Sequence, residues 1–443
     1  MAWFHSGSRS ALRSIAGRRT ALILAIAALA VLALGAPAVA LSPGDEQCLS
    51  CHKMEAMEKP LQNGESLSLH ISGDTFGKSV HSMFGCAACH SDIDPAKHPG
   101  SPMPIASKRD FSIMRAKVCT TCHTDQAEQW NHGVHAALVR EGNPIAPVCT
   151  SCHAPHGVIK GAAQIMDTVS CKTCHGDIFA AYSTSVHGTL RSAGITQAPL
   201  CFNCHGAHDV KVPTAGAGMK GVCLGCHKDA LAKHSEWLPN TQLHFEVINC
   251  PVCHAPNAHR KVDLILFNST TKKDAPRPVG VPEFDHLENV SASSPSGVDP
   301  VMLFKLMAAL NKGGSADHMS VKGRLDVQTG DEAHRLMVAS EAIRDCKTCH
   351  QAGASAFQSV TVSVAGPAGI PQHYDVNKDV LKSVFSLNSI GGFYAIGGTR
   401  ITLFDVLLVL ALLAGIGVPI VHIGVRWLAH RPEDVKKRDS GEK

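Results

Sequence analysis

The spacing of the cysteines is the feature that most constrains this chain. All 18 cysteines fall into nine copies of the pattern C-x-x-C, and a histidine directly follows each copy. Because 27 of the 443 residues are histidine, about one position in sixteen, nine histidines at nine such positions are not a chance result. The motifs are Cys48/Cys51/His52, Cys86/Cys89/His90, Cys119/Cys122/His123, Cys149/Cys152/His153, Cys171/Cys174/His175, Cys201/Cys204/His205, Cys223/Cys226/His227, Cys250/Cys253/His254 and Cys346/Cys349/His350.

The pattern C-x-x-C-H is typical of covalent attachment of c-type haem. The two thiols form thioether bonds to the porphyrin, and the adjacent imidazole becomes an axial ligand of the iron. Zinc ribbons and disulfide scaffolds also use paired cysteines, but neither requires a histidine directly after the second cysteine. The sequence therefore predicts nine covalent haem c groups.

Both ends of the chain carry an apolar segment. Four arginines precede the apolar residues 21–34, and Ala38 and Ala40 form an A-x-A site, which predicts a cleaved signal peptide over residues 1–40. An uncleaved anchor is the alternative, although 14 apolar residues are short for a bilayer crossing. Near the other end, the 20 residues from Val406 to Val425 contain no Asp, Glu, Lys or Arg, the length of one crossing.

Basic residues follow this second segment, so the positive-inside rule places the tail, 429–443, in the cytoplasm and the haem motifs in the periplasm. We expect one transmembrane helix over 401–428 in the cytoplasmic membrane, because outer-membrane proteins normally cross as closed barrels. The formal charge of +4 includes the leader arginines and omits the haem propionates. It therefore gives no support to nucleic-acid binding.

The motifs repeat in pairs. Motif starts 119, 171 and 223 are separated by 52 residues each, and 149 and 201 are also 52 apart. The spacing predicts four units of two haems over residues 41–261. Each unit carries two further histidines, one predicted distal ligand for each of eight irons: His81, His98, His135, His156, His187, His208, His244 and His259.

A histidine only three residues after the motif histidine, as in His153 and His156, is too near in sequence to reach the far face of the same haem. We therefore expect such histidines to ligate a neighbouring haem. Ligation by two histidines suits electron relay more than substrate binding. Aromatic residues make up only 5% of the chain, so the predicted fold is mostly α and irregular, with the haems as its core.

The C-terminal third is less regular. Residues 262–345 lack haem motifs and read as a proline-rich linker with two helices. One helix begins with Asp299 as N-cap and ends at Gly313, and the other begins at a Thr329/Glu332 capping box and runs into the ninth motif.

Residues 346–400 form the ninth haem and membrane-proximal segment, with a short strand over 357–364 and a turn at Gly366 and Pro367. His334 is the first choice as distal ligand of the ninth iron. The alternatives are His318, His373 and His286. The histidines outside the repeat, His70, His132 and His234, are predicted to be surface residues.

One histidine lies inside the predicted transmembrane helix. His422 follows Gly415, Gly417 and Pro419. An intramembrane histidine is a functional hypothesis by default, here a ligand of a shared haem b or a contact of a quinone headgroup. The alternative is an interfacial histidine near the cytoplasmic headgroups.

The motifs and the segments around His135 (GVHA) and His187 (SVHG) resemble the multihaem cytochrome c superfamily over residues 48 to about 260. Nine haems, a leader and a C-terminal anchor look like the c-type subunit of quinol-oxidising cytochrome b/c complexes of anaerobically respiring bacteria. This resemblance implies a polytopic cytochrome b that oxidises menaquinol and passes electrons through this chain to periplasmic carriers. The chain itself would then be an electron-transfer subunit without catalytic residues.

A multihaem reductase of nitrite, hydroxylamine or a sulfur oxyanion is the alternative function. Such an enzyme needs one iron with an open axial position, which ammonia-forming nitrite reductases often mark with lysine in place of the motif histidine. No C-x-x-C-K occurs here, and 15 non-motif histidines lie between residues 41 and 400. The haems at His52 or His350 would be the sites of such a reaction. A haem-based sensor is a third class, for which the predicted tail is short.

Overall fold

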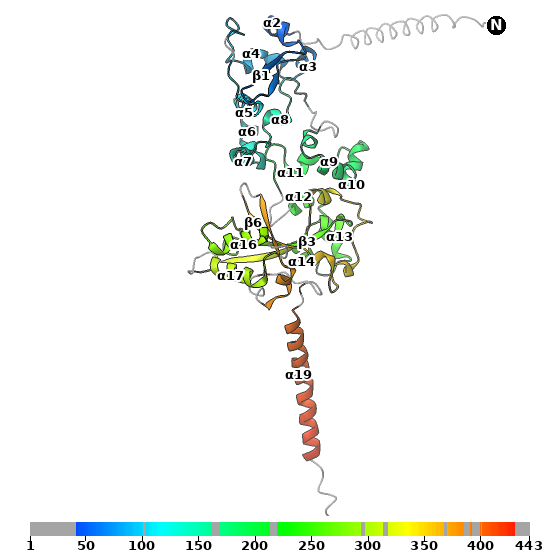
Figure 1. The fold of residues 1–443 in the computed structure, drawn as a ribbon. Helices are drawn as coiled ribbons and strands as arrows, with labels where there is room; N and C mark the ends of the chain where they lie inside the picture. Colours follow the sequence, from blue (N-terminus) through cyan, green and yellow to red (C-terminus); the bar gives the residue numbers. More distant parts are fainter. Residues whose placement is uncertain are drawn as a thin grey trace, which may run out of the picture. The chain divides into compact units, whose positions relative to one another are not determined.

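The computed structural model describes residues 41–429, except 101–102, 161–168, 213–218, 294–296, 313–317, 367–369, 385–389, 392–398 and 400. The predicted signal peptide, Gly313, Pro367 and the predicted tail from 430 onward lie outside the described residues. The chain divides into two compact units, 1–128 with 139–170, and 129–138 with 171–443. Figure 1 colours the chain from blue at its N-terminal end to red at its C-terminal end and labels many of the elements named below.

The first unit consists of short helices and one small hairpin. Its helical segments are α2 (Pro43–His52), α3 (Gly73–Gly77), η1 (Ser82–Phe84), α4 (Cys86–Cys89), α5 (Lys108–Cys119), α6 (Thr124–Asn131, which runs into the second unit) and α8 (Cys149–Cys152). The strands β1 (Glu58–Pro60) and β2 (Ser66–Ser68) pair antiparallel. Ser42 caps α2 in a capping box with Asp45. The same Asp45 carboxylate accepts the backbone N–H of Cys86 at 2.7 Å, which joins the first two motifs.

Helices of the second unit carry the next motifs. They are α7 (Val134–Arg140), η4 (Ser170–Thr173), α9 (Gly176–Ser183), α10 (Val186–Ser192), α11 (Cys201–His205), α12 (Lys220–Cys226), α13 (Ala230–Ser235), α14 (Thr241–Val247) and α15 (Pro251–His254). The ninth motif begins at η5 (Cys346–Thr348).

Most motifs form one helical turn. In seven of them the backbone N–H of the motif histidine donates to the carbonyl of the first cysteine, with N···O distances of 2.8–3.1 Å. Residues i, i+3 and i+4 of a helical turn lie on one face. The two thiols and the imidazole of each motif are therefore presented on the same side, as attachment to one haem requires.

The second unit also contains a mixed β-sheet, which the sequence analysis did not predict. Its strand order is β7-β6-β3-β5-β8, with β4 paired to β3. The long strands β3 and β5 pair antiparallel along their whole length, and β6 runs parallel to β3. The bounds are β3 (Arg260–Asn268), β4 (Lys273–Asp274), β5 (Met319–Val327), β6 (Val360–Ala365), β7 (Pro371–Val376) and β8 (Ile390–Gly391).

Two helices, α16 (Pro282–Ser293) and α17 (Pro300–Leu310), complete the core of this sheet. Alternate residues of β3 point into it because successive side chains of a strand face opposite sides. The core includes Val262, Leu264, Leu266, Phe284 and Leu303, each no more than 1% exposed. Segments η6 (Ser355–Phe357) and η8 (Lys378–Lys382) flank β6 and β7.

The structure therefore corrects the prediction of a linker over 262–345. The first predicted helix is confirmed as α17, whose N-cap Asp299 accepts the Met302 N–H at 2.8 Å. The second is wrong: α18 (Gly330–His334) has five residues, and Thr329 makes no side-chain cap. The Thr329 hydroxyl bonds to Asp331 instead, so the capping box does not form. The predicted strand is present as β6, shifted toward its C-terminal end.

The C-terminal helix α19 (Thr402–Ala429) matches the predicted transmembrane segment. Within the described residues it is the one helix long and apolar enough to cross a membrane, with a mean hydropathy of 2.6 over its best window. None of the residues in that window is buried inside the protein. This helix fits a membrane anchor by length and composition.

Candidate haem-binding site

In the part of the chain that the structure describes, eight motif histidines each face a second histidine. The ring centres of each pair lie 5.8–6.5 Å apart. In motif order the pairs are His52–His98, His90–His156, His123–His81, His175–His135, His205–His334, His227–His187, His254–His234 and His350–His244. Both members of every pair belong to the same unit.

This separation fits one iron between two imidazoles. A bond from a metal to an imidazole nitrogen is about 2 Å long, and that nitrogen lies about 1 Å from the ring centre. Two rings on opposite sides of one iron therefore have centres about 6 Å apart. Rings in direct stacking contact would lie closer, near the lower end of the 4.5–7 Å range of aromatic pairs.

Several rings also place Nδ1 beside a carbonyl oxygen, a contact that favours the tautomer needed for ligation. The Nδ1 atoms of His52 and His205 lie 2.9 and 3.0 Å from the carbonyl oxygens of Leu69 and Lys211. Three partner rings are held by the carbonyl four residues earlier: His234 at 2.7 Å, His244 at 3.2 Å and His334 at 2.6 Å. An Nδ1–H that donates to a carbonyl leaves the Nε2 lone pair free for a metal.

Comparisons with curated proteins point in the same direction. The chain is 27% identical over 198 residues to the multiheme cytochrome MtrA of Shewanella baltica, covering 42% of this chain and 53% of the relative. It is 24% identical over 313 residues to the high-molecular-weight cytochrome c of Nitratidesulfovibrio vulgaris, covering 60% of this chain and 50% of the relative. These similarities support a multihaem c-type cytochrome.

The similarities to known cytochromes are partial. A third relative, the multiheme cytochrome MtrC of Shewanella baltica, is 25% identical over 173 residues, 36% of this chain and 23% of the relative. The chain thus spans about half, or less, of the length of these relatives. No family model and no solved structure matches. Relatives of this kind imply covalently bound c-type haems and electron transfer.

Seven of the predicted distal histidines lie in these pairs: His81, His98, His135, His156, His187, His244 and His334. Two of them face a partner that the sequence did not suggest. His334, expected at the ninth motif, faces His205 of the sixth, and His244 faces His350 of the ninth.

Two predicted distal ligands, His259 and His208, lie outside the eight pairs. One histidine within the pairs, His234, was not predicted as a ligand. His259 is exposed, and its Nδ1 lies 2.6 Å from a carboxylate oxygen of Glu332. His234, predicted as a surface residue, instead faces His254. The motif histidine His153 and the predicted ligand His208 have interactions outside these eight pairs.

The alternatives for the ninth motif also lie elsewhere. His373 contacts Ser363 at 2.5 Å and lies 3.6 Å from the buried carboxylate of Asp263 in the sheet. The His318 backbone N–H donates to Thr270. His286 is an exposed residue of α16.

The second cysteines of six motifs are exposed: Cys51, Cys89, Cys122, Cys152, Cys174 and Cys226. The sequence predicts that each of them forms a thioether bond to a haem. The contacts of three of them are local: the Ser50 and Thr121 hydroxyl oxygens lie 3.8 Å from the sulfurs of the cysteines that follow them, and the Cys174 N–H donates to the Cys171 carbonyl at 3.3 Å.

Contacts between residues so close in sequence orient a thiol but do not enclose it. Three first cysteines are exposed as well: Cys48, Cys171 and Cys346. An exposed thiol is accessible for reaction, as haem attachment requires. Haem attachment at Cys51, Cys122 and Cys174 stays a prediction.

The first cysteines of neighbouring motifs lie together. A hydrogen bond with Cys201 raises the pKa of the Cys171 thiol. Cys250 acts in the same way on Cys223. Burial, with Cys149 nearby, raises the pKa of Cys119. None of the 18 cysteines is in a disulfide, and no cluster of three or more His, Cys, Asp or Glu among the described residues could hold a bare metal ion.

Burial keeps several of the paired rings neutral. It is the main cause that lowers the pKa of His90, His135, His156, His187, His254 and His334. A metal binds the neutral imidazole, so a lowered pKa favours the ligating form at physiological pH. At His90 the positive charge of Arg115 is the second cause.

Proposed function

We propose that this chain is a nine-haem c-type cytochrome that relays electrons outside the cytoplasm. The eight histidine pairs carry the proposal, because each pair can supply both axial ligands of one iron. Haem c supplies one-electron chemistry when bound. An iron with two protein ligands has no open position for a substrate, so these pairs favour relay over reduction of nitrite, hydroxylamine or a sulfur oxyanion.

The pairs also suggest how successive haems are tied together. Each predicted two-haem repeat carries two extra histidines. The first of them faces the first motif histidine of the next haem group along the chain, as His81 faces His123 and His135 faces His175. The same holds for His187 with His227, and for His244 with His350. A distal ligand supplied by the preceding two-haem repeat holds adjacent haems at a fixed spacing, which a relay requires.

The haem count gives the first test. Purified protein is expected to carry nine haems per chain in a pyridine haemochrome assay, with an intact mass that contains nine covalent haems, because every cysteine belongs to a motif. Substituting both cysteines of one motif, for example Cys346 and Cys349 by alanine, should remove one haem. A wild-type count below eight would contradict the assignment of the motifs.

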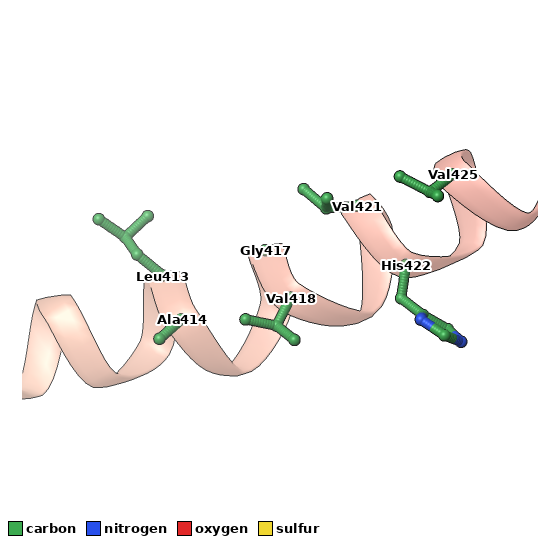
Figure 2. A pocket seen from close by; sticks show the side chains of 7 residues that line it. All are labelled: Leu413, Ala414, Gly417, Val418, Val421, His422 and Val425. Atoms are coloured by element: carbon green, nitrogen blue, oxygen red, sulfur yellow. The ribbon is translucent and has the colours of Figure 1, made fainter.

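We further propose that α19 anchors the cytochrome in the cytoplasmic membrane, beside a polytopic cytochrome b that oxidises menaquinol. In Figure 2 the His422 ring projects from the helix, and Gly417 leaves a shallow depression between the side chains around it. His422 lies 20 residues after Thr402, about 30 Å along a helix of 1.5 Å rise per residue. It is therefore too far along the membrane helix to serve a covalent haem, and a membrane partner would have to satisfy its polar ring.

The variant His422→Ala tests this second proposal. We expect it to retain all nine haems but to weaken co-purification with a membrane partner, or to slow haem reduction by a menaquinol analogue in stopped-flow measurements. Ile423→Ala, a neighbouring exposed apolar residue, is the matched control. If His422→Ala and the control behave alike in both assays, His422 is an interfacial residue and the quinol-oxidising role loses its support from this side chain.

A further inference from the structure

The eight histidine pairs differ in what their Nδ1 atoms contact. In the sixth pair, both rings reach a backbone carbonyl: His205 contacts Lys211 O at 3.0 Å, and His334 contacts Gly330 O at 2.6 Å. Among the eight described pairs this is the one with a carbonyl at both rings. In the second pair, the Nδ1 of His90 is buried and has no hydrogen-bond partner among the described residues.

Hydrogen bonds of this kind change the affinity of an imidazole for the two oxidation states of iron. An Nδ1–H that donates to a carbonyl makes the ring more basic. A more basic ligand stabilises the oxidised iron, which carries the higher charge, and so lowers the reduction potential. Two such bonds lower the potential of the sixth haem from both sides. The buried, unpartnered Nδ1 of His90 gives no such stabilisation at the second haem.

A positive charge acts on the second haem in addition. Arg115 makes two hydrogen bonds of 2.8 Å to the carboxylate of Asp92, two residues after His90. The Arg115 side chain is 15% exposed and that of Asp92 is 45% exposed, so water screens the carboxylate more than the guanidinium. Arg115 also lies over the Phe111 ring at 5.3 Å, which helps to fix its position. The guanidinium of Arg115 acts on His90 more strongly than the opposing carboxylate of Asp92. The net field at His90 is therefore positive, and it destabilises the oxidised iron.

We propose that these contacts place the two haems at opposite ends of the potential range of the eight paired haems, with the sixth lowest and the second highest, and with Arg115 as a residue that tunes the second. The inference rests on the proposed haem relay. In such a transfer a single electron passes from the sixth haem, which is oxidised, to the second haem, which is reduced. Net flow is then favoured from the second unit, which contains α19, toward the first.

Ligand replacement can locate each haem in a redox titration. Methionine raises the potential of the haem it ligates. In a spectropotentiometric titration of the full-length holoprotein, His334→Met should therefore remove the lowest-potential component, and His156→Met should shift the highest component upward. Loss of an intermediate component in either variant would overturn the proposed order.

Charge replacement tests Arg115 separately. Arg115→Gln should shift the highest-potential component downward, whereas Arg115→Lys, which keeps the charge, should leave it near its wild-type position. Arg109→Gln, on the same helix α5, is the matched control and should leave the titration unchanged. If Arg115→Gln matches the control, or if Arg115→Lys shifts as far as Arg115→Gln, the charge of Arg115 does not tune this haem.

Haem counts and spin states of the same samples distinguish a failure of the proposed order of potentials from a failure of the proposed relay. A variant with nine low-spin haems and an unexpected titration contradicts only the proposed order of potentials. Wild-type protein without low-spin haems would contradict the relay itself.

Discussion

Replacing His334 with alanine is expected to convert the sixth haem to a high-spin form and to leave the ninth low-spin. The His334 ring lies 5.8 Å from His205 of the sixth motif, so its removal leaves that iron without a second ligand. Replacing His244 should instead affect the ninth haem, because its ring lies 6.0 Å from His350. Low-temperature EPR of each oxidised variant measures this change: one haem should give a high-spin signal, and the others should give low-spin signals.

A background without the ninth haem identifies which iron has changed. In a Cys346→Ala/Cys349→Ala protein, the high-spin signal of His334→Ala should persist, and the high-spin signal of His244→Ala should be absent. His259→Ala is the control, since its ring contacts Glu332 and should leave every haem low-spin. The opposite result, in which the His334→Ala signal needs the ninth motif, would support the ligand assignment predicted from the sequence.

The second large effect concerns the sheet. Leu264 is fully buried in β3, between strands β5 and β6. Leu264→Ala should lower the free energy of unfolding by about 2–5 kcal/mol, because it removes buried apolar surface and leaves a cavity. Strand β5 contacts α14, α15 and α18, so we expect the haem spectrum of this unit to change at a lower denaturant concentration. Denaturant titrations followed by circular dichroism and by the haem Soret band measure both.

The matched control for the sheet is Val279→Ala, at a residue that is 86% exposed. A surface substitution of this kind usually changes stability by no more than about 0.5 kcal/mol. If Leu264→Ala is no more destabilising than Val279→Ala, the region behaves as the linker predicted from the sequence over residues 262–345.

The sequence was sufficient where a local pattern decides the structure. The motif turns, the α17 helix with its Asp299 cap and the apolar α19 helix all depend on residues within a few positions of one another. The sheet was missed because the prolines after residue 275 suggested a loop. The apolar run in β3, from Leu264 to Phe267, was the signal that could have predicted a buried strand.

Which histidine faces which motif is a long-range property, and spacing in the sequence does not determine it. The repeat suggested that His259 was equivalent to His208, but the sheet brings Glu332 within 2.6 Å of its ring. The short helix α18, packed against α9, brings His334 to the sixth motif. His234, on α13, does not occupy a position of the repeat, because it lies only seven residues after His227. The sequence pattern therefore did not mark it as a ligand.

The central claim, that paired histidines hold iron, is tested most directly by low-temperature EPR with near-infrared magnetic circular dichroism of the oxidised holoprotein. We expect at least eight low-spin irons with two histidine ligands each. Ring planes at 60–64° in His123–His81, His254–His234 and His350–His244 leave two iron d orbitals nearly degenerate, so three haems should give large-gmax signals. The five pairs with planes at 9–29° should give rhombic signals. A spectrum dominated by high-spin iron, or by histidine–methionine charge-transfer bands, would contradict the account.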